Sequence, residues 1–367
     1  MHTELIYQLA LTHVPNIGCV HAKALMAAFT SAKDVFTAKK STLEKVDGIG
    51  PQKAECIKKF DNFSIAEHEL AFIEKYKITP LFINSDQYPK RLLNCYDSPT
   101  MLYYRGDADL NAGKIIAVVG TRSNTEYGKH FTDSFIKELA AEKILVLSGL
   151  AFGVDTIAHK AALKNGLSTV GVLAHGLDNI YPAENTKMAK QMVANGGGLL
   201  TEFASGTKPD RHNFPTRNRI VAGMADATIV IETDLKGGSM ITAEMANNYN
   251  RDVFALPGKT TDGKSKGCNF LIRNNEAALI TSAHDFLEQM LWLPQPGKTK
   301  KVQRTLFVEL TPDEKTIVDL LNEHEQLPID ELYLKSQLST SAVAAVLLSL
   351  ELQGLITSLP GKMYKLL

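Results

Sequence analysis

The fold is decided by a short apolar run and the polar turn after it: Lys114-Ile115-Ile116-Ala117-Val118-Val119, then Gly120-Thr121-Arg122-Ser123. A short run rich in β-branched residues predicts a strand that is buried on both faces. Similar runs follow, and amphipathic helices are predicted between most of them. This alternation predicts an α/β domain whose parallel sheet is covered by helices on both faces. The later runs are 144–147, 169–173, 198–201, 227–231, 253–256 and 278–280.

Residues 1–78 are predicted to form a separate all-helical domain. Two turns in it, Val14-Pro15-Asn16-Ile17-Gly18 and Val46-Asp47-Gly48-Ile49-Gly50, each precede a helix, as in a helix-hairpin-helix. Glycines in such turns let backbone N–H groups approach a phosphate, and Lys53 follows the second turn. A packing or oligomerisation module that has lost contact with DNA explains the same pattern equally well.

The C-terminal part is predicted as a linker over 294–308 and a winged-helix domain over 309–367, which leaves 79–293 for the central domain. The linker is rich in proline and basic residues. Thr311 and Glu314 form a capping-box pattern, and Pro360-Gly361 joins two predicted strands. The helix predicted at 340–352 has no Lys or Arg, so it fits a packing or partner surface better than a DNA-reading helix.

Composition narrows the function without deciding it. The chain has 367 residues, 44% hydrophobic and 22% charged, which is ordinary for a globular protein. Its formal net charge is zero, so nucleic-acid binding would need a local basic patch. The four cysteines are far apart, and neither a zinc site nor a disulfide framework is predicted. With no signal-peptide pattern and no apolar run of membrane length, we predict a cytoplasmic protein without a membrane segment.

The loops that follow the predicted strands carry glycine, hydroxyl or charged residues. In an open parallel sheet, ligands bind beyond the carboxyl ends of the strands, so these loops are expected to converge on one edge. Small residues there leave room for a ligand and expose backbone donors. The loops are 120–123, 148–153, 174–178, 202–203, 232–239 and 257–259.

The stretch Phe214-Pro215-Thr216-Arg217-Asn218-Arg219-Ile220 is expected at the start of a helix on the same edge. A helix start offers free N–H groups and partial positive charge, and two guanidiniums strengthen this anion site. The ring of Phe214 could stack on a base. This chemistry suits a phosphate backbone with exposed bases. The alternative is a structural helix whose arginines pair with carboxylates and whose phenylalanine fills the core.

At this point the chain resembles the DNA-processing protein A family (DprA, also called Smf). The resemblance rests on separated motifs in order over residues 80–290. It implies a Rossmann-like central domain, a homodimer, binding of single-stranded DNA, protection of incoming strands in natural transformation and handover to the RecA recombinase. It implies no catalysis, no metal and no cofactor. The motifs lie at 117–122, 148–159, 176–182, 214–220, 237–244 and 257–269.

Site residues follow from the resemblance, motif by motif. Asp155 and His159 are expected to be local struts for the loop that begins at Ser148, rather than a metal or acid–base pair. Arg122, Arg217 and Arg219 would hold phosphates, and Lys208 and Arg211 would extend that basic run. Phe214 would stack on a base or be buried under its helix. The full predicted DNA-binding set is Arg122, Ser148, Gly149, Lys208, Arg211, Phe214, Arg217, Asn218 and Arg219.

Two enzyme functions on the same edge are weighed as alternatives. Gly258 to Ser265 satisfies the spacing of a phosphate-binding loop, which would suit an ATPase. Gly237 to Glu244 resembles the loop of phosphoribohydrolases, in which the glutamate serves the chemistry, although Ser239-Met240-Ile241-Thr242 departs from the usual Gly-Thr pair. Either alternative would make the chain a nucleotide-binding enzyme.

Overall fold

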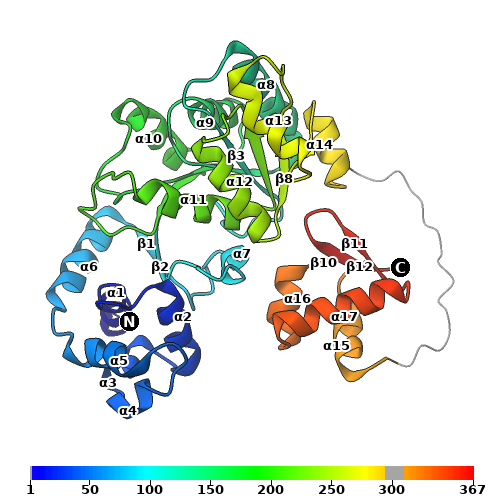
Figure 1. Cartoon of the computed structure of the whole chain (residues 1–367). Helices are drawn as coiled ribbons and strands as arrows, with labels where there is room; N and C mark the ends of the chain where they lie inside the picture. The colour runs from blue at the N-terminus through cyan, green and yellow to red at the C-terminus, as the bar shows by residue number, and fades with distance from the viewer. Residues whose placement is uncertain (1, 294–309) are drawn as a thin grey trace.

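The computed structural model describes residues 2–293 and 310–367, and a nine-stranded sheet lies at its centre (Figure 1). The strand order is β1-β2-β6-β5-β4-β3-β7-β8-β9. From β6 to β9 in this order all neighbours pair in parallel, whereas β1 and β2 continue the sheet antiparallel beyond β6. The strands are β1 (Thr79–Phe82), β2 (Met101–Gly106), β3 (Ile115–Gly120), β4 (Leu145–Ser148), β5 (Thr169–Val172), β6 (Gly198–Thr201), β7 (Ala227–Ile231), β8 (Asp252–Ala255) and β9 (Ala278–Leu279).

Helices cover both faces of the sheet, as predicted. Successive residues of β3 point to opposite faces: Ile116 and Val118 pack with α8, α9 and α14, and Ile115 and Ala117 belong to the cluster that includes α11, α12 and α13. The predicted α/β class is therefore confirmed. The helices of this domain are α7 (Lys90–Leu93), α8 (Glu126–Glu138), α9 (Val154–Lys164), α10 (Thr186–Ala194), α11 (Asn213–Met224), α12 (Gly238–Asn248), α13 (Lys266–Arg273) and α14 (Ala283–Gln289), with 3₁₀ turns η1 (Leu139–Glu142), η2 (Ala183–Asn185) and η3 (Gly263–Ser265).

Strands β1 and β2 were not predicted from the sequence. They follow one another through the short helix α7 and pair antiparallel, outside the strand–helix alternation that identified the other strands. The last two residues of β1 and the first four of β2 are buried, and the N-terminal helices lie beyond this end of the sheet (Figure 1).

The N-terminal helices use their two turns differently. Lys23, just after the first turn, donates hydrogen bonds to the carbonyls of Leu93 and Cys95 at 2.6 and 3.2 Å, so this turn attaches the domain to the central one. The second turn, where Gly48 has φ +75°, lies at the surface, and Lys53 donates to the Gly48 carbonyl at 2.6 Å. The helices are α1 (His2–Leu11), α2 (Cys19–Ala28), α3 (Ala32–Thr37), α4 (Lys40–Leu43), α5 (Gly50–Lys59) and α6 (Ser64–Tyr76).

The C-terminal domain is a winged helix, as predicted, with its capping box formed between Thr311 and Glu314. It docks on the central domain through Asp330, whose carboxylate accepts from Arg251 at 2.8 Å and from Asn94 at 2.7 Å. The linker predicted over 294–308 lies outside the described residues, and the predicted domain boundaries stay predictions. The elements are α15 (Pro312–Glu323), α16 (Ile329–Ser336), α17 (Thr340–Leu352), β10 (Leu327–Pro328), β11 (Ile356–Leu359) and β12 (Met363–Leu366).

Across 2–293 and 310–367, every helix is too short or too polar to cross a lipid bilayer.

Candidate nucleic-acid interface

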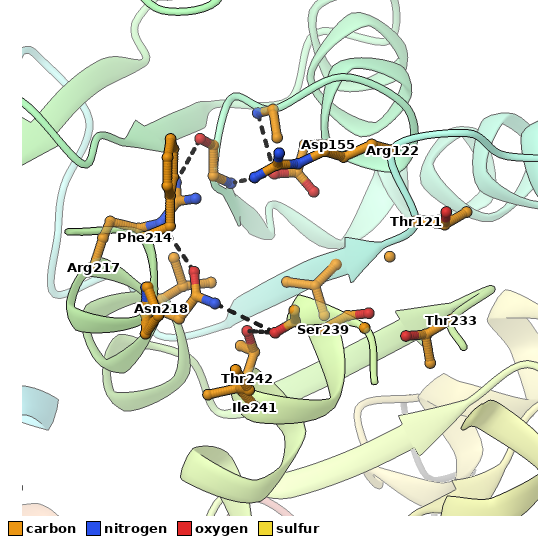
Figure 2. A pocket seen from close by; sticks show the side chains of 18 of the residues that line it. Thr121, Arg122, Asp155, Phe214, Arg217, Asn218, Thr233, Ser239, Ile241 and Thr242 are labelled. Carbon is orange, nitrogen blue, oxygen red and sulfur yellow. Dashed lines mark hydrogen bonds between the residues drawn. The ribbon is translucent and has the colours of Figure 1, made fainter. Parts of the chain in front are cut away.

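The carboxyl edge of the sheet encloses a cavity of about 340 Å³ between the turns after β3, β4 and β7 and the first turns of α11 and α12 (Figure 2). The structure thus brings together three of the six loops that the sequence placed on one edge, 120–123, 148–153 and 232–239, with part of the stretch 214–220; the loops 174–178, 202–203 and 257–259 do not line this cavity. Its polar lining includes Arg122, Asp155, Arg217, Asn218 and Ser239. The other lining residues are Val119, Gly120, Thr121, Gly149, Ala151, Phe214, Pro215, Val221, Thr233, Asp234, Gly237, Gly238, Ile241 and Thr242.

Arg122 and Phe214 meet at this cavity. The guanidinium carbon of Arg122 lies 5.2 Å from the centre of the Phe214 ring, within the range of a cation–π contact. Phe214 is half-buried rather than part of the core, and Arg122 is exposed. Within the described ranges, Arg122 pairs with no carboxylate, so its charge is free to meet an anion.

A buried glutamate holds the turn that carries Arg122. Glu232 accepts hydrogen bonds from the backbone N–H of Thr125 at 2.8 Å and from the Thr125 hydroxyl, and its own carbonyl accepts from the N–H of Thr121 at 2.7 Å. These bonds fix the turn on both sides of Arg122. The guanidinium is therefore presented from a rigid base, which lowers the entropy cost of binding.

Arg217 lies at the floor of the cavity and is only 5% exposed. Its Nη1 donates to the carbonyl of Gly149 at 2.5 Å and also to that of Val172. Burial lowers the pKa of Arg217 to about 10, with Asp155 opposing and Arg122 adding to the shift. A side chain at position 149 would collide with this guanidinium, since a Cβ there would overlap Nη1 of Arg217. Arg217 therefore supports the β4 turn while adding positive charge below the cavity.

Asp155 has the supporting role that the sequence predicted. Its Oδ2 accepts from the N–H groups of Gly149 and Ala151 at 3.1 and 3.2 Å. Burial raises the pKa of Asp155, and Arg217 opposes that shift. His159 does not reach this turn, contrary to prediction: its Nδ1 lies 2.7 Å from the hydroxyl of Thr169, deeper in the domain.

Arg219 is not at the cavity, contrary to what the motif suggested. It is 8% exposed, forms an ion pair with Glu202 and donates to the carbonyl of Asp97. Residues two apart on an α-helix point about 200° apart around its axis, so Arg217 and Arg219 cannot face the same side. Arg219 therefore fits the alternative reading of this stretch, a structural helix whose arginines pair with carboxylates.

The remaining predicted residues divide between the cavity and its surroundings. Ser148 is buried and donates to the Val118 carbonyl at 2.6 Å, so its hydroxyl is committed to the sheet. Asn218 lines the cavity and donates to the Gly238 carbonyl at 3.4 Å, which links α11 to α12. Lys208 and Arg211 are exposed on the connection from β6 to α11, outside the cavity lining.

Two residues that support the cavity and its rim were not predicted from the sequence. Tyr181 is 48% exposed, and its ring centre lies 6.2 Å from that of Phe214. Asn185 donates to the Leu150 carbonyl at 2.9 Å and so supports the β4 turn from another loop. Tyr181 lies in the connection after β5, so the expectation that ligands bind beyond the carboxyl ends of the strands could have pointed to it. Nothing in the sequence marks Asn185 as a partner of Leu150.

The structure does not favour either enzyme alternative. Glu244 is exposed on α12 and does not line the cavity. In the loop that resembles a phosphate-binding loop, the N–H of Gly258 donates to Asn269 at 3.1 Å and that of Lys264 to Asp262 at 2.9 Å. Amides that are already bonded cannot cradle a phosphate. In the described part of the chain, no cluster of His, Cys, Asp or Glu is suited to hold a metal ion.

Comparison with known proteins settles the family. The model of the family "DNA recombination-mediator protein A" matches residues 79–291, which carry the sheet and the cavity. The chain belongs to this family. A SAM-like helix-hairpin-helix tandem also matches residues 9–60, and the winged-helix domain of DprA matches residues 307–362. The resemblance read from the motifs is therefore confirmed.

Relatives of the recombination-mediator protein A family match over most of the chain. Protein Smf of Synechocystis is 32% identical over 99% of both chains, and protein Smf of Escherichia coli is 33% identical over 89% of this chain and 88% of its own. The X-ray structure of Streptococcus pneumoniae DprA is similar with a TM-score of 0.65 at 34% identity, over 77% of this chain and 96% of the other. The Helicobacter pylori DprA structure, with a TM-score of 0.53 at 33% identity over 59% and 96%, concerns the single-stranded DNA binding mode of that protein.

Proposed function

We propose that this chain binds single-stranded DNA along the carboxyl edge of its central sheet and catalyses no reaction there. The observation that carries the proposal is the exposed guanidinium of Arg122, which lies 5.2 Å from the centre of the half-buried Phe214 ring at the cavity and has no ion-pair partner among the described residues. A cation beside an accessible ring suits a strand whose phosphates and bases are both exposed. Membership of the recombination-mediator protein A family supports it.

In this proposal each residue contacts a different part of the strand. Arg122 holds a phosphate, and Lys208 and Arg211 extend the basic surface toward β6. Phe214 provides a stacking surface for a base, which any base can use, so binding is expected to be independent of sequence. Gly149 and Asn218 shape the cavity. The buried Arg217 adds positive electrostatic potential below it and holds the turn after β4. Arg219 and Ser148 are left with structural roles.

The biological setting is proposed from the family. DNA bound here would be protected during transformation or DNA processing and passed to a RecA-type recombinase, and the working form would be a homodimer. Support comes from the name and the relatives of the family, which include DNA processing protein DprA of Streptococcus pneumoniae.

The proposal is tested by fluorescence anisotropy with a labelled 20-nucleotide oligothymidylate, a matched duplex and a series of salt concentrations. We expect single strands to bind more tightly than duplex, and affinity to fall with salt because bound counterions are released. An excess of mononucleotide should not displace the oligonucleotide. Absence of strand binding at low salt, or full displacement by mononucleotide, would contradict the proposal and favour a nucleotide-binding enzyme.

A further inference from the structure

The loop from Gly258 to Ser265 reaches the turn that carries Arg122. The ammonium group of Lys264 donates a hydrogen bond to the hydroxyl of Ser123, the residue next to Arg122. The hydroxyl of Tyr127, in the first turn of α8, donates to the carbonyl of Pro257 at 2.9 Å. Two contacts therefore join the loop after β8 to the turn after β3, although β7 lies between these strands in the sheet.

The loop is built to hold Lys264 in place. The carboxylate of Asp262 accepts a hydrogen bond from the backbone N–H of Lys264 at 2.9 Å, and the backbone carbonyl of Asp262 accepts one from the N–H of Ser265 at 3.2 Å. Asn269 both donates to and accepts from the backbone of Gly258, at 2.9 and 3.1 Å. These bonds satisfy the loop from within, and of its two lysines, Lys259 and Lys264, it is Lys264 whose ammonium group reaches the turn of Arg122.

Two cationic side chains, Arg122 and Lys264, meet at this turn, and the buried Glu232 carboxylate beside it uses its oxygens on Thr125. In residues 2–293 and 310–367, neither Arg122 nor Lys264 has an ion-pair partner. The nearby Glu126 is paired with Lys129 at 3.2 Å, and Asp262 uses its carboxylate on the loop backbone. Like charges that two neighbouring loops hold close together repel each other, and a bound polyanion relieves that repulsion.

We propose that Lys264 binds a second phosphate of the same DNA strand, beside the phosphate held by Arg122. This inference rests on the function proposed above. From β6 to β3, whose turn carries Arg122 and receives Lys264, the strand order makes three steps, which at roughly 4.8 Å each span about 14 Å. A stacked strand with a rise of about 3.4 Å per nucleotide covers this distance with about four nucleotides. Lys208 and Arg211 stand at one end of this path, and Arg122 and Lys264 stand together at the other end.

The test compares Lys264→Ala with the wild-type protein on an oligothymidylate of 20 nucleotides. Losing one exposed phosphate contact is expected to weaken the 20-mer about three- to fivefold and to lower the slope of log affinity against log salt by about 0.7. Lys264→Arg should restore binding of the 20-mer. Lys164→Ala is the matched control, because Lys164 is exposed at the end of α9 that leads into β5, on the opposite edge of the sheet.

Unchanged affinity for the 20-mer, or an equal loss with Lys164→Ala, would overturn the proposal. Saturable ATP binding that Lys264→Ala abolishes would also overturn it and would assign the loop to a nucleotide. If the wild-type protein binds no single strand, the proposed function itself fails. If Arg122→Ala weakens binding and Lys264→Ala does not, only this further inference fails.

Discussion

The guanidinium of Arg122 lies 5.2 Å from the ring centre of Phe214, so the turn after β3 and the first turn of α11 form one surface. Each residue has a second neighbour that fixes its position: Glu232 holds the turn of Arg122, and Tyr181 lies 6.2 Å from Phe214. A cation and a ring presented together can act on the two chemically different parts of a single strand. Substitutions of the two residues should therefore affect DNA binding in different ways.

Arg122→Ala should weaken binding of an oligothymidylate 20-mer by about tenfold, since a hydrogen bond to a charged group contributes about 1.5–3 kcal/mol. Loss of one phosphate contact should also lower the salt slope by about 0.7. Anisotropy titrations at several salt concentrations measure both quantities. Thermal unfolding should be unchanged because Arg122 is exposed. An unchanged affinity would place the phosphate site elsewhere.

Phe214→Ala should reduce affinity by about 1–3 kcal/mol, the range for a base stacked on an aromatic ring, without changing the salt slope. Phe214→Trp should keep most of the affinity. Anisotropy titrations at several salt concentrations measure both the affinity and the salt slope of each variant. A change of slope comparable to that of Arg122→Ala would show that the ring acts by positioning the guanidinium rather than by stacking.

Arg219→Met should destabilise the fold by about 3–5 kcal/mol, because it leaves the buried Glu202 carboxylate without its partner. Glu202 is already short of partners, since its Oε1 has no hydrogen bond. Urea unfolding measures the loss. The folded variant should bind the 20-mer within about twofold of wild type, as expected for separate sites. A large loss of affinity with normal stability would restore Arg219 to the DNA site.

Acid should destabilise the protein through His159. Thr169 donates its hydroxyl proton to the Val146 carbonyl, so His159 Nδ1 must donate to Thr169, and the buried Nε2 has no partner for a proton. Burial lowers the pKa of His159 to about 3. The unfolded chain therefore binds the proton first, and stability falls as the pH drops from about 6.5 toward 3, by about 2 kcal/mol at pH 5.

Urea midpoints between pH 7.5 and 5 check this effect. His159→Leu should flatten the dependence, while His130→Gln, at an exposed position, should leave it as in wild type. An equally steep dependence in His159→Leu would assign the acid sensitivity to other groups.

Asp330→Ala should release the winged helix from the central domain. The substitution removes the partner of the buried Arg251 and the acceptor of Asn94. Small-angle X-ray scattering should show a larger radius of gyration, and Asp313→Ala, at an exposed position of α15, should not change it. Strand affinity should stay unchanged because Arg251 immediately precedes β8, at the edge opposite the cavity. A compact Asp330→Ala variant would show that other contacts hold the domain.

The sequence by itself determined the central α/β fold, the winged helix and the loops that form the site. Apolar runs alternating with helices predict parallel strands, and parallel strands place their following loops on one edge whatever the details of packing. Asp155 could be predicted as a strut because its partners, Gly149 and Ala151, lie within six residues of it in the chain. Strands β1 and β2 escaped prediction because they pair outside this alternation.

Only the tertiary structure decided which charges are available. Arg217 and Arg219 look equivalent in the sequence, yet the turn of α11 directs one toward the Gly149 carbonyl and the other toward Glu202. Lys264 belongs to a sequence pattern for a nucleotide loop, yet the packing of that loop brings it to Ser123. Short-range patterns fix secondary structure, whereas the partner of a charged side chain depends on residues far away in the chain. The free energy of burying a charge makes that partner decisive.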